Sequence, residues 1–234
     1  MNKNRLGFVK QLGGETEMKR WLVIGLVPIL ALGGVMAGCA RIEVTPPEQE
    51  IPPPEETIGT AKVTLADSPD ILDLSSELSG DFKHETFTSQ EMADYLKLGL
   101  GPWSDWQIFH RESPLLRVSS TMTVLSSEEE RIACDEFLQN PDRIASHIDE
   151  GYQQEDGDFE LTSVEVNPVD IGDVAVLILE EKTLEDRYLI FSKNVYFRYK
   201  DVVVYVNTLY SKGAPPSTVD LAKAIEQRIE DYYK

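Results

Sequence analysis

The sequence contains few of the residues on which most catalytic and metal-binding motifs depend. Its 234 residues include two cysteines and three histidines, which excludes a disulfide-stapled miniprotein. Basic residues are also scarce, with 22 Lys and Arg against 41 Asp and Glu, and a net charge of −19 disfavours nucleic acid as a partner. Only one long uncharged apolar run is present, so a polytopic membrane protein is excluded as well.

The first 38 residues have the composition of a secretory signal peptide. They carry a net charge of +3, whereas the chain from Cys39 onward carries −22. Lys19 and Arg20 precede the uncharged segment 21–40, in which an apolar run is followed by small residues. Basic residues on this flank orient the rest of the chain to the outside of the cytoplasm. We therefore predict export.

Translation of the natural protein is expected to start at Met18 rather than at Met1. A start at Met18 gives the short basic n-region Met-Lys-Arg, whereas a start at Met1 gives a long one that contains Glu15 and Glu17. The predicted signal peptide, residues 1–38, is shorter by 17 residues in that case.

The five residues that end at Cys39 read Val-Met-Ala-Gly-Cys, with Met36 where Leu is usual. This segment resembles the lipobox of prokaryotic lipoproteins. The resemblance implies cleavage between Gly38 and Cys39 and attachment of a lipid with fatty acyl chains such as palmitate to the Cys39 thiol. An uncleaved transmembrane helix is the alternative, since twenty apolar residues can span a bilayer. Both alternatives leave the chain after residue 40 outside the cytoplasm and attached to a membrane.

Residues 39–60 form the predicted lipidated N-terminus and a linker rich in proline and glutamate. Five prolines restrict the backbone and five glutamates repel one another, so the segment is expected to be extended and to reach on the order of 60 Å. A proline-rich recognition ligand is the alternative interpretation. The remaining residues, 61–234, are enough for one core and are predicted to form a single extracytoplasmic domain.

The domain is predicted to be α+β, with an antiparallel β-sheet sandwiched by helices. A short strand or extended arm is expected at 71–78. Hydrophobic periodicity and capping residues predict helices at 89–98, at 128–138, from Pro141 onward and at 217–232. Strands are predicted at 106–111, 115–125, 159–166, 174–179, 187–199 and 202–210, the last four as an antiparallel meander.

The predicted hairpin at 197–206 and the terminal helix at 217–232 resemble parts of the photosystem II extrinsic P subunit-like family. This resemblance implies a sandwich of helices around an antiparallel sheet. Folds of this kind host many activities, so it implies no function.

Few residues of the sequence fit a catalytic, metal-binding or ligand-binding pattern. The three histidines lack metal-ligand spacing, and we expect them to be exposed. Cys134 lies on the apolar face of a predicted helix and is expected to be a buried residue without reactivity. The acidic segment 155–160 comes nearest to a calcium loop but lacks the twelve-residue ligand series, so a solvated loop is expected and calcium binding is the alternative. Trp103 and Trp106 are the candidate ligand-binding residues, because two indoles can stack on a sugar or a peptide. The alternative interpretation, which we favour, is that the two rings form a hydrophobic plug at the edge of the sandwich.

We predict a membrane-anchored binding or accessory lipoprotein that is not an enzyme and that holds no metal or cofactor. Its partners would be the membrane, through the lipid on Cys39, and an envelope protein or a small ligand. Two alternatives stay open: an envelope hydrolase with a pair of carboxylates that sequence alone does not reveal, and a structural component of the envelope.

Overall fold

A computed structural model describes residues 63–91, 103–111, 115–154, 159–184 and 188–234. The predicted signal peptide and linker lie outside these residues. The elements are η4 (Leu65–Asp67), α3 (Ser68–Ile71), β1 (Lys83–Phe87), β2 (Trp106–Arg111), β3 (Leu116–Val124), α5 (Glu128–Leu138), α6 (Pro141–Gln154), β4 (Phe159–Pro168), β5 (Val174–Leu184), β6 (Tyr188–Tyr199), β7 (Val202–Tyr210) and α7 (Thr218–Tyr233).

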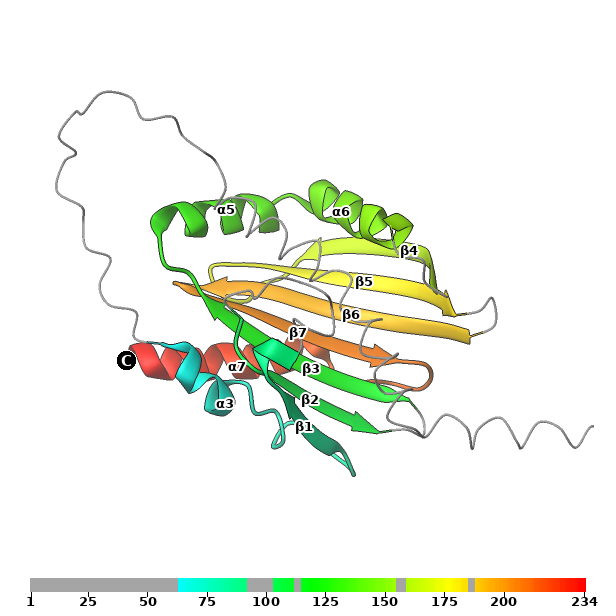
Figure 1. Cartoon of the computed structure of the whole chain (residues 1–234), viewed down its shortest axis with the longest axis horizontal. Helices are drawn as coiled ribbons and strands as arrows, with labels where there is room; N and C mark the ends of the chain where they lie inside the picture. Colours follow the sequence, from blue (N-terminus) through cyan, green and yellow to red (C-terminus); the bar gives the residue numbers. More distant parts are fainter. Residues whose placement is uncertain (1–62, 92–102, 112–114, 155–158, 185–187) are drawn as a thin grey trace, which may run out of the picture.

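One antiparallel sheet of seven strands organises the domain, in the order β1-β2-β3-β7-β6-β5-β4 (Figure 1). The predicted meander from β4 to β7 is confirmed, with each strand paired to the next along the chain. β3 pairs with β7 rather than with β4, so the chain between β3 and β4 must cross to the far edge of the sheet. Helices α5 and α6 make this crossing.

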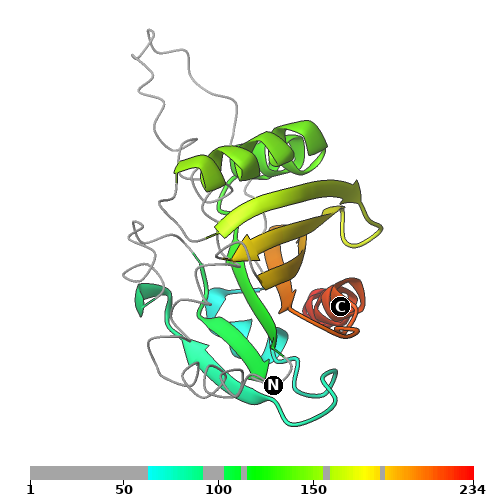
Figure 2. The ribbon, with the colours of Figure 1, turned by 90° about the vertical axis from the view of Figure 1, so that its right-hand side faces the viewer.

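Helices cover both faces of the sheet, and each face has its own apolar core. α7 lies on one face, where Ile225 and Ile229 join a core that includes Val204 and Phe197. α5 and α6 lie on the other face, where Phe137 and Ile148 belong to a second core. Figure 2 shows the sheet between these two layers. The α+β class and the single domain are therefore confirmed.

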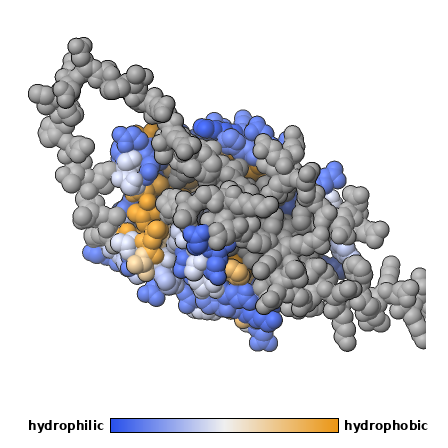
Figure 3. Space-filling view, viewed as in Figure 1, coloured by the Kyte–Doolittle hydropathy of each residue, from blue (hydrophilic) through white to orange (hydrophobic). Residues whose placement is uncertain are grey.

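Local sequence signals explain where the main helices begin. Ser127 and Ser217 cap α5 and α7, and each side chain accepts a hydrogen bond from a backbone amide three residues later. Asn140 caps α6 in the same way, with Pro141 as its first residue. These caps agree with the sequence-based predictions. Figure 3 shows hydrophilic residues over α6, whereas α5 also exposes the apolar side chain of Ile132.

Two predictions near the start of the domain are wrong or incomplete. The strand or extended arm predicted at 71–78 does not form a strand. Instead, the short helix α3 ends at Ile71, and irregular chain follows it. Pro69 favours the helical turn at this point, because proline suits the first turn of a helix. β1 was not predicted, since this exposed edge strand has a single apolar residue, Phe87, and no alternating pattern. Of the predicted helix at 89–98, the structure describes only its first three residues, which Thr88 precedes as the cap.

Candidate functional site

The sheet face that carries α5 and α6 becomes polar toward one end of its central strands. Near α5 this face is lined by apolar residues such as Val176 and Val203. Further along the same strands, alternate positions carry buried polar side chains. We call this set the polar cluster: Glu180 and Lys182 on β5, Ser192 and Asn194 on β6, and Tyr205 and Asn207 on β7.

Strand register makes these residues neighbours. Asn194 of β6 lies opposite Asn207 of β7, and Ser192 lies opposite Glu180 of β5. Because side chains on a strand alternate between faces, the two members that each strand contributes stand on the same side of the sheet. Asn194 and Asn207 are each 0% exposed.

Glu180 and Lys182 form an ion pair inside the domain. Lys182 Nζ lies 2.5 Å from Glu180 Oε2, and both side chains are fully buried. Removing two charges from water costs several kcal/mol for each ion, and apolar residues of similar size often give equal or greater stability. Stability alone therefore does not explain why this sheet interior contains a charged pair.

Hydrogen bonds connect the ion pair to the two asparagines. Asn194 Nδ2 donates to Glu180 Oε1 over 3.3 Å, which leaves Asn194 Oδ1 to accept from Asn207 Nδ2 over 2.7 Å. Asn207 Nδ2 also donates to Ser192 Oγ over 2.8 Å. Asn207 Oδ1 is buried and has no hydrogen-bond partner within the part of the chain that the structure describes.

Tyr205 completes the network as a hydrogen-bond donor. Its hydroxyl donates to Asn194 Oδ1 over 2.8 Å. Burial and the nearby Glu180 carboxylate raise the pKa of Tyr205 well above its ordinary value, and Arg117 offsets part of this shift. The phenol therefore keeps its proton at physiological pH and remains a donor.

Polar residues continue from the cluster onto β3. Ser119 lies opposite Asn207 and is 3% exposed, and Arg117, Thr121 and Thr123 on the same side of this strand are also buried. The site thus extends over four adjacent strands, β3, β7, β6 and β5.

The cluster contains one carboxylate among the described residues, whereas most glycoside hydrolases use two that are about 5–10 Å apart. Glu85, another glutamate on this face, belongs to β1 and is five strand positions from Glu180, on the order of 20 Å. Its carboxylate is 3.3 Å from His110 Nε2. Within the described residues, the cluster thus provides one carboxylate together with neutral hydrogen-bond donors and acceptors.

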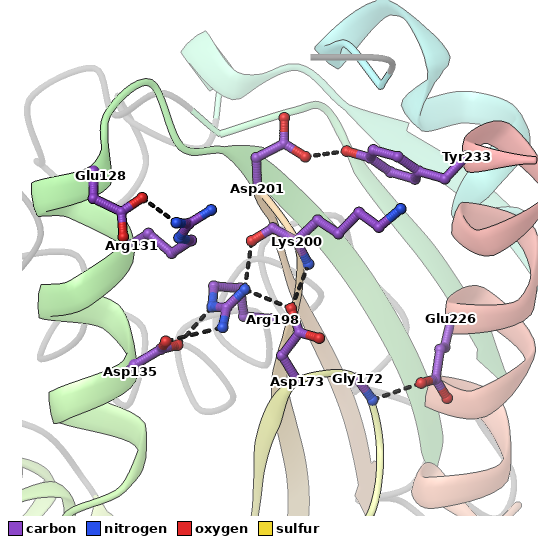
Figure 4. A network of polar contacts seen from close by, with 10 residues as sticks. All are labelled: Glu128, Arg131, Asp135, Gly172, Asp173, Arg198, Lys200, Asp201, Glu226 and Tyr233. Atoms are coloured by element: carbon purple, nitrogen blue, oxygen red, sulfur yellow. Dashed lines mark hydrogen bonds and ion pairs between the residues drawn. The ribbon is translucent and has the colours of Figure 1, made fainter. Parts of the chain in front are cut away.

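A second polar network, the Arg198 clamp, joins three segments at the α5 end of the sheet (Figure 4). Arg198 donates to both carboxylate oxygens of Asp135 on α5, over 2.5 and 2.9 Å. Its Nη1 also donates to Asp173 Oδ2 over 2.6 Å and to the Lys200 carbonyl oxygen over 2.5 Å. Although burial opposes its charge, the bonds to Asp135 and Asp173 raise the pKa of Arg198.

The surroundings of the clamp indicate a structural role. The Asp173 carboxylate also accepts a hydrogen bond from the backbone amide of Lys200. Lys200 lies in the turn between β6 and β7 and has a φ of 55°. Gly172, with a φ of 61°, donates to Glu226 of α7 over 2.6 Å, and a Cβ at this position would clash with the Arg198 carbonyl oxygen. The charged groups bind one another, so the clamp fastens α5 and the two turns together.

The two predicted ligand-binding tryptophans have different environments. Trp106 is 3% exposed and lies edge-on to Tyr205, with ring centroids 5.8 Å apart, so it offers no open stacking surface. Trp103 is half-buried and forms an isolated bridge with Thr123. The structure thus places Trp106 beside the polar cluster, and a ligand role for this pair stays a prediction. The predicted processing residues Gly38 and Cys39 lie outside the described residues.

The remaining candidates are separate from the cluster. His110 is buried, contrary to the expectation of exposed histidines, because β2 is covered on both faces. No group of three or more metal-ligating side chains occurs in the described ranges, and most of the acidic segment 155–160 falls outside them. Cys134 is buried as predicted, and burial raises the pKa of its thiol to about 12.

Sequence reasoning missed the polar cluster, although one signal was present. Asparagine is unfavourable in β-strands, yet Asn194 and Asn207 interrupt two otherwise strongly strand-forming segments. Which face each asparagine occupies, and that the two residues meet, follows only from the register of β6 and β7.

Comparisons with known proteins identify no family. No family model and no curated protein matches the sequence. The extracellular domain of PknH from Mycobacterium tuberculosis aligns with 72% of this chain and 97% of its own, at 11% identity and a TM-score of 0.42. A protein of unknown function from Pseudomonas aeruginosa aligns over 58% and 73%, at 15% identity and a TM-score of 0.26. At these scores neither alignment carries an argument about this chain.

Proposed function

We propose that this chain is a membrane-anchored, extracytoplasmic lipoprotein whose domain binds a small polar ligand without transforming it. The observation that carries the proposal is the polar cluster, in which six polar side chains are buried within a sheet interior and Asn207 Oδ1 lacks a partner. An unsatisfied buried acceptor costs about 1–3 kcal/mol, and a bound donor removes that cost. Binding therefore accounts for an arrangement that folding alone disfavours.

The anchor part of the proposal is supported by the sequence. Cys39 follows an apolar segment and small residues, in the arrangement of a lipobox, and the proline-rich linker after it separates the domain from the membrane. Among the described residues, no helix has the length and apolar character needed to cross a bilayer.

Thermal unfolding of the mature protein in detergent, with a panel of sugars, polyols, amino acids and dipeptides, tests binding. A ligand present at a hundredfold excess over its Kd adds about 2.7 kcal/mol to the free energy of unfolding. This raises the Tm of a domain of this size by about 5–10 °C. The increase should disappear in Asn194→Leu and persist in Asn167→Leu, a control at an exposed position of β4. A panel that leaves Tm unchanged, or equal shifts in both variants, would contradict the proposal.

A further inference from the structure

We propose that the sheet surface beside α7 docks an amphipathic helix with basic flanks, supplied by a partner protein. This surface, which we call the open strip, consists of Leu177 and Leu179 on β5 and Leu189 and Phe191 on β6. Side chains alternate along a strand, so Leu179 lies on the opposite face of the sheet from its neighbour Glu180. The open strip is therefore separate from the polar cluster, and the inference does not rest on the proposed function.

The helical layer that contains α7 has room for a second helix. α7 packs on β6 and β7, and η4 and α3 lie on its other side, toward β3. Strands are about 4.8 Å apart and a helix with its side chains is about 10 Å wide, so the next position in this layer is over β4 and β5. No helix of the described residues occupies that position, whereas α5 and α6 cover β4 and β5 from the other face (Figure 2).

The open strip carries apolar side chains at positions where a sheet facing water usually has polar ones. β4 follows the usual pattern on this side, because Ser163, Glu165 and Asn167 are exposed. In contrast, Leu189 is 41% exposed, and the other three residues of the strip are half-buried. Contiguous apolar side chains at a surface are typical of an interaction site.

Strand register makes the strip continuous. Lys193 lies opposite Leu179, and Glu181 lies opposite Phe191, so Leu179 and Phe191 are diagonal neighbours about 7–8 Å apart. The other two residues of the strip continue it by one same-face position along each strand. An amphipathic helix presents apolar side chains three and four residues apart, which suits an apolar strip of this kind.

The charges beside the strip favour a basic partner. Glu165 and Glu181 each lie directly opposite a residue of the strip. Neither carboxylate forms an ion pair within the part of the chain that the structure describes. The neighbouring Lys193 instead places its Nζ over the Tyr210 ring, 5.6 Å from the centroid. A helix with Lys or Arg along its flanks would bring opposite charges next to these two carboxylates.

A second copy of this chain fits the open strip less well than a basic helix does. Two copies in contact through the strip would bring their Glu165 and Glu181 carboxylates together. The chain from Cys39 onward also carries a net charge of −22, so two copies repel each other. Because like charges at an interface reduce affinity, we assign the strip to a different protein.

Fluorescence anisotropy with designed peptides tests this assignment. The mature chain with Cys39→Ser is used, so that no lipid or detergent competes for the peptides. The basic probe is an amphipathic peptide of about 15 residues, with Leu along one face and Lys on both flanks. A second peptide has Glu in place of each Lys, and a third has the composition of the basic probe in scrambled order. We expect saturable micromolar binding of the basic probe, a gain in its helical circular dichroism on binding, and at least tenfold weaker binding of the other two.

Substitutions at exposed residues locate the binding surface without disturbing the core. Leu189→Ser removes an apolar side chain from the strip, and Glu165→Lys reverses a charge beside it, so each should weaken binding of the basic probe at least fivefold. Ile132→Ser and Glu129→Lys make matching changes at exposed positions of α5, on the other face of the sheet. These two control variants should leave the Kd unchanged.

Several results would overturn the inference. Equal binding of the acidic or the scrambled peptide would refute the basic amphipathic helix as the partner, as would a basic probe that does not bind or that binds without a gain in helical signal. Equal weakening by the α5 variants would place the binding elsewhere. Self-association of the chain that Leu189→Ser abolishes, measured by sedimentation velocity, would assign the strip to a second copy instead. Tm shifts with small ligands are measured separately, so failure here leaves the proposed function standing.

Discussion

Glu180 and Lys182 show how two residues on one strand can determine the character of a whole site. Because they are two positions apart on β5, the strand directs both side chains to the same face, where they pair and are fully buried. The Glu180 carboxylate then orients Asn194, and Asn194 orients Asn207. The open acceptor on β7 is thus a consequence of a charge on β5.

Lys182→Met should destabilise the domain strongly. The substitution leaves the Glu180 carboxylate buried without its ion-pair partner, which costs about 3–5 kcal/mol, whereas Glu180→Leu combined with Lys182→Met should cost much less. Urea unfolding at pH 7 measures both. Lys223→Met, at an exposed position of α7, is the control and should change the free energy of unfolding by less than about 0.5 kcal/mol. Equal costs for the single and the double variant would show that the pair is not coupled.

The Cys134 thiol should be unreactive in the folded protein. Burial raises its pKa to about 12, and the neighbouring Asp135 adds to the shift, so almost no thiolate is present at pH 9. In a Cys39→Ser variant, where Cys134 is the remaining thiol, labelling by iodoacetamide should require urea. Since the unfolded thiol ionises near pH 8.5, stability should also decrease as the pH rises above that value. Rapid labelling under native conditions would contradict the buried assignment.

At the scale of elements, the Arg198 clamp attaches the α5–α6 layer to the sheet. One guanidinium binds α5 through Asp135 and the β4–β5 turn through Asp173, at the end of the sheet where α5 begins its crossing. Such bidentate contacts have a specific geometry that a lysine cannot reproduce. The residues of the clamp are far apart in the sequence but adjacent in the structure.

Asp135→Asn should weaken this attachment by about 1–3 kcal/mol, because it replaces a charge-assisted bidentate contact with a neutral one. Hydrogen exchange should become faster in α5 and stay unchanged in α7, which lies on the opposite face. Glu136→Gln removes an adjacent exposed carboxylate of the same helix and serves as the control. If Asp135→Asn and Glu136→Gln lower the free energy of unfolding by similar amounts, the loss of a negative charge, rather than the loss of the clamp, explains the destabilisation.

The elements differ in how far sequence could predict them. Ser127, Ser217 and the Asn140-Pro141 pair are local signals, so the starts of three helices were predictable. α3 and the exposed edge strand β1 were missed, because a one-turn helix and a strand with one apolar residue have no repeating pattern. The pairing of β3 with β7 depends on contacts distant in sequence, which composition does not encode.

At the scale of the whole molecule, an acidic domain follows an N-terminal segment that is basic and apolar. The class of the domain could be predicted, since it depends on hydrophobic periodicity, whereas the lipid anchor stays a prediction from the N-terminal pattern. The candidate site could not be predicted, because Glu180, Asn194 and Asn207 meet only after three strands have paired in a specific register. Trp106 was a candidate for stacking, and it lies within the core beside that site.

Cys39→Ser should abolish anchoring without affecting the domain. We expect the precursor to keep its signal peptide, incorporation of labelled palmitate to cease and the Tm of the domain to remain unchanged. Metabolic labelling and cell fractionation in a prokaryotic host measure the first two. Cys134→Ser is the matched control and should retain the label. Undiminished labelling of Cys39→Ser would refute lipidation at this residue.

Native mass spectrometry of the protein extracted from its own membranes tests the central claim most directly. We predict a chain that begins at Cys39, carries covalent lipid and holds a non-covalent small molecule, and we predict that Asn207→Ala has the lipid but lacks the small molecule. A wild-type protein without any bound small molecule after gentle extraction, or an Asn207→Ala variant that retains one equally well, would contradict the account.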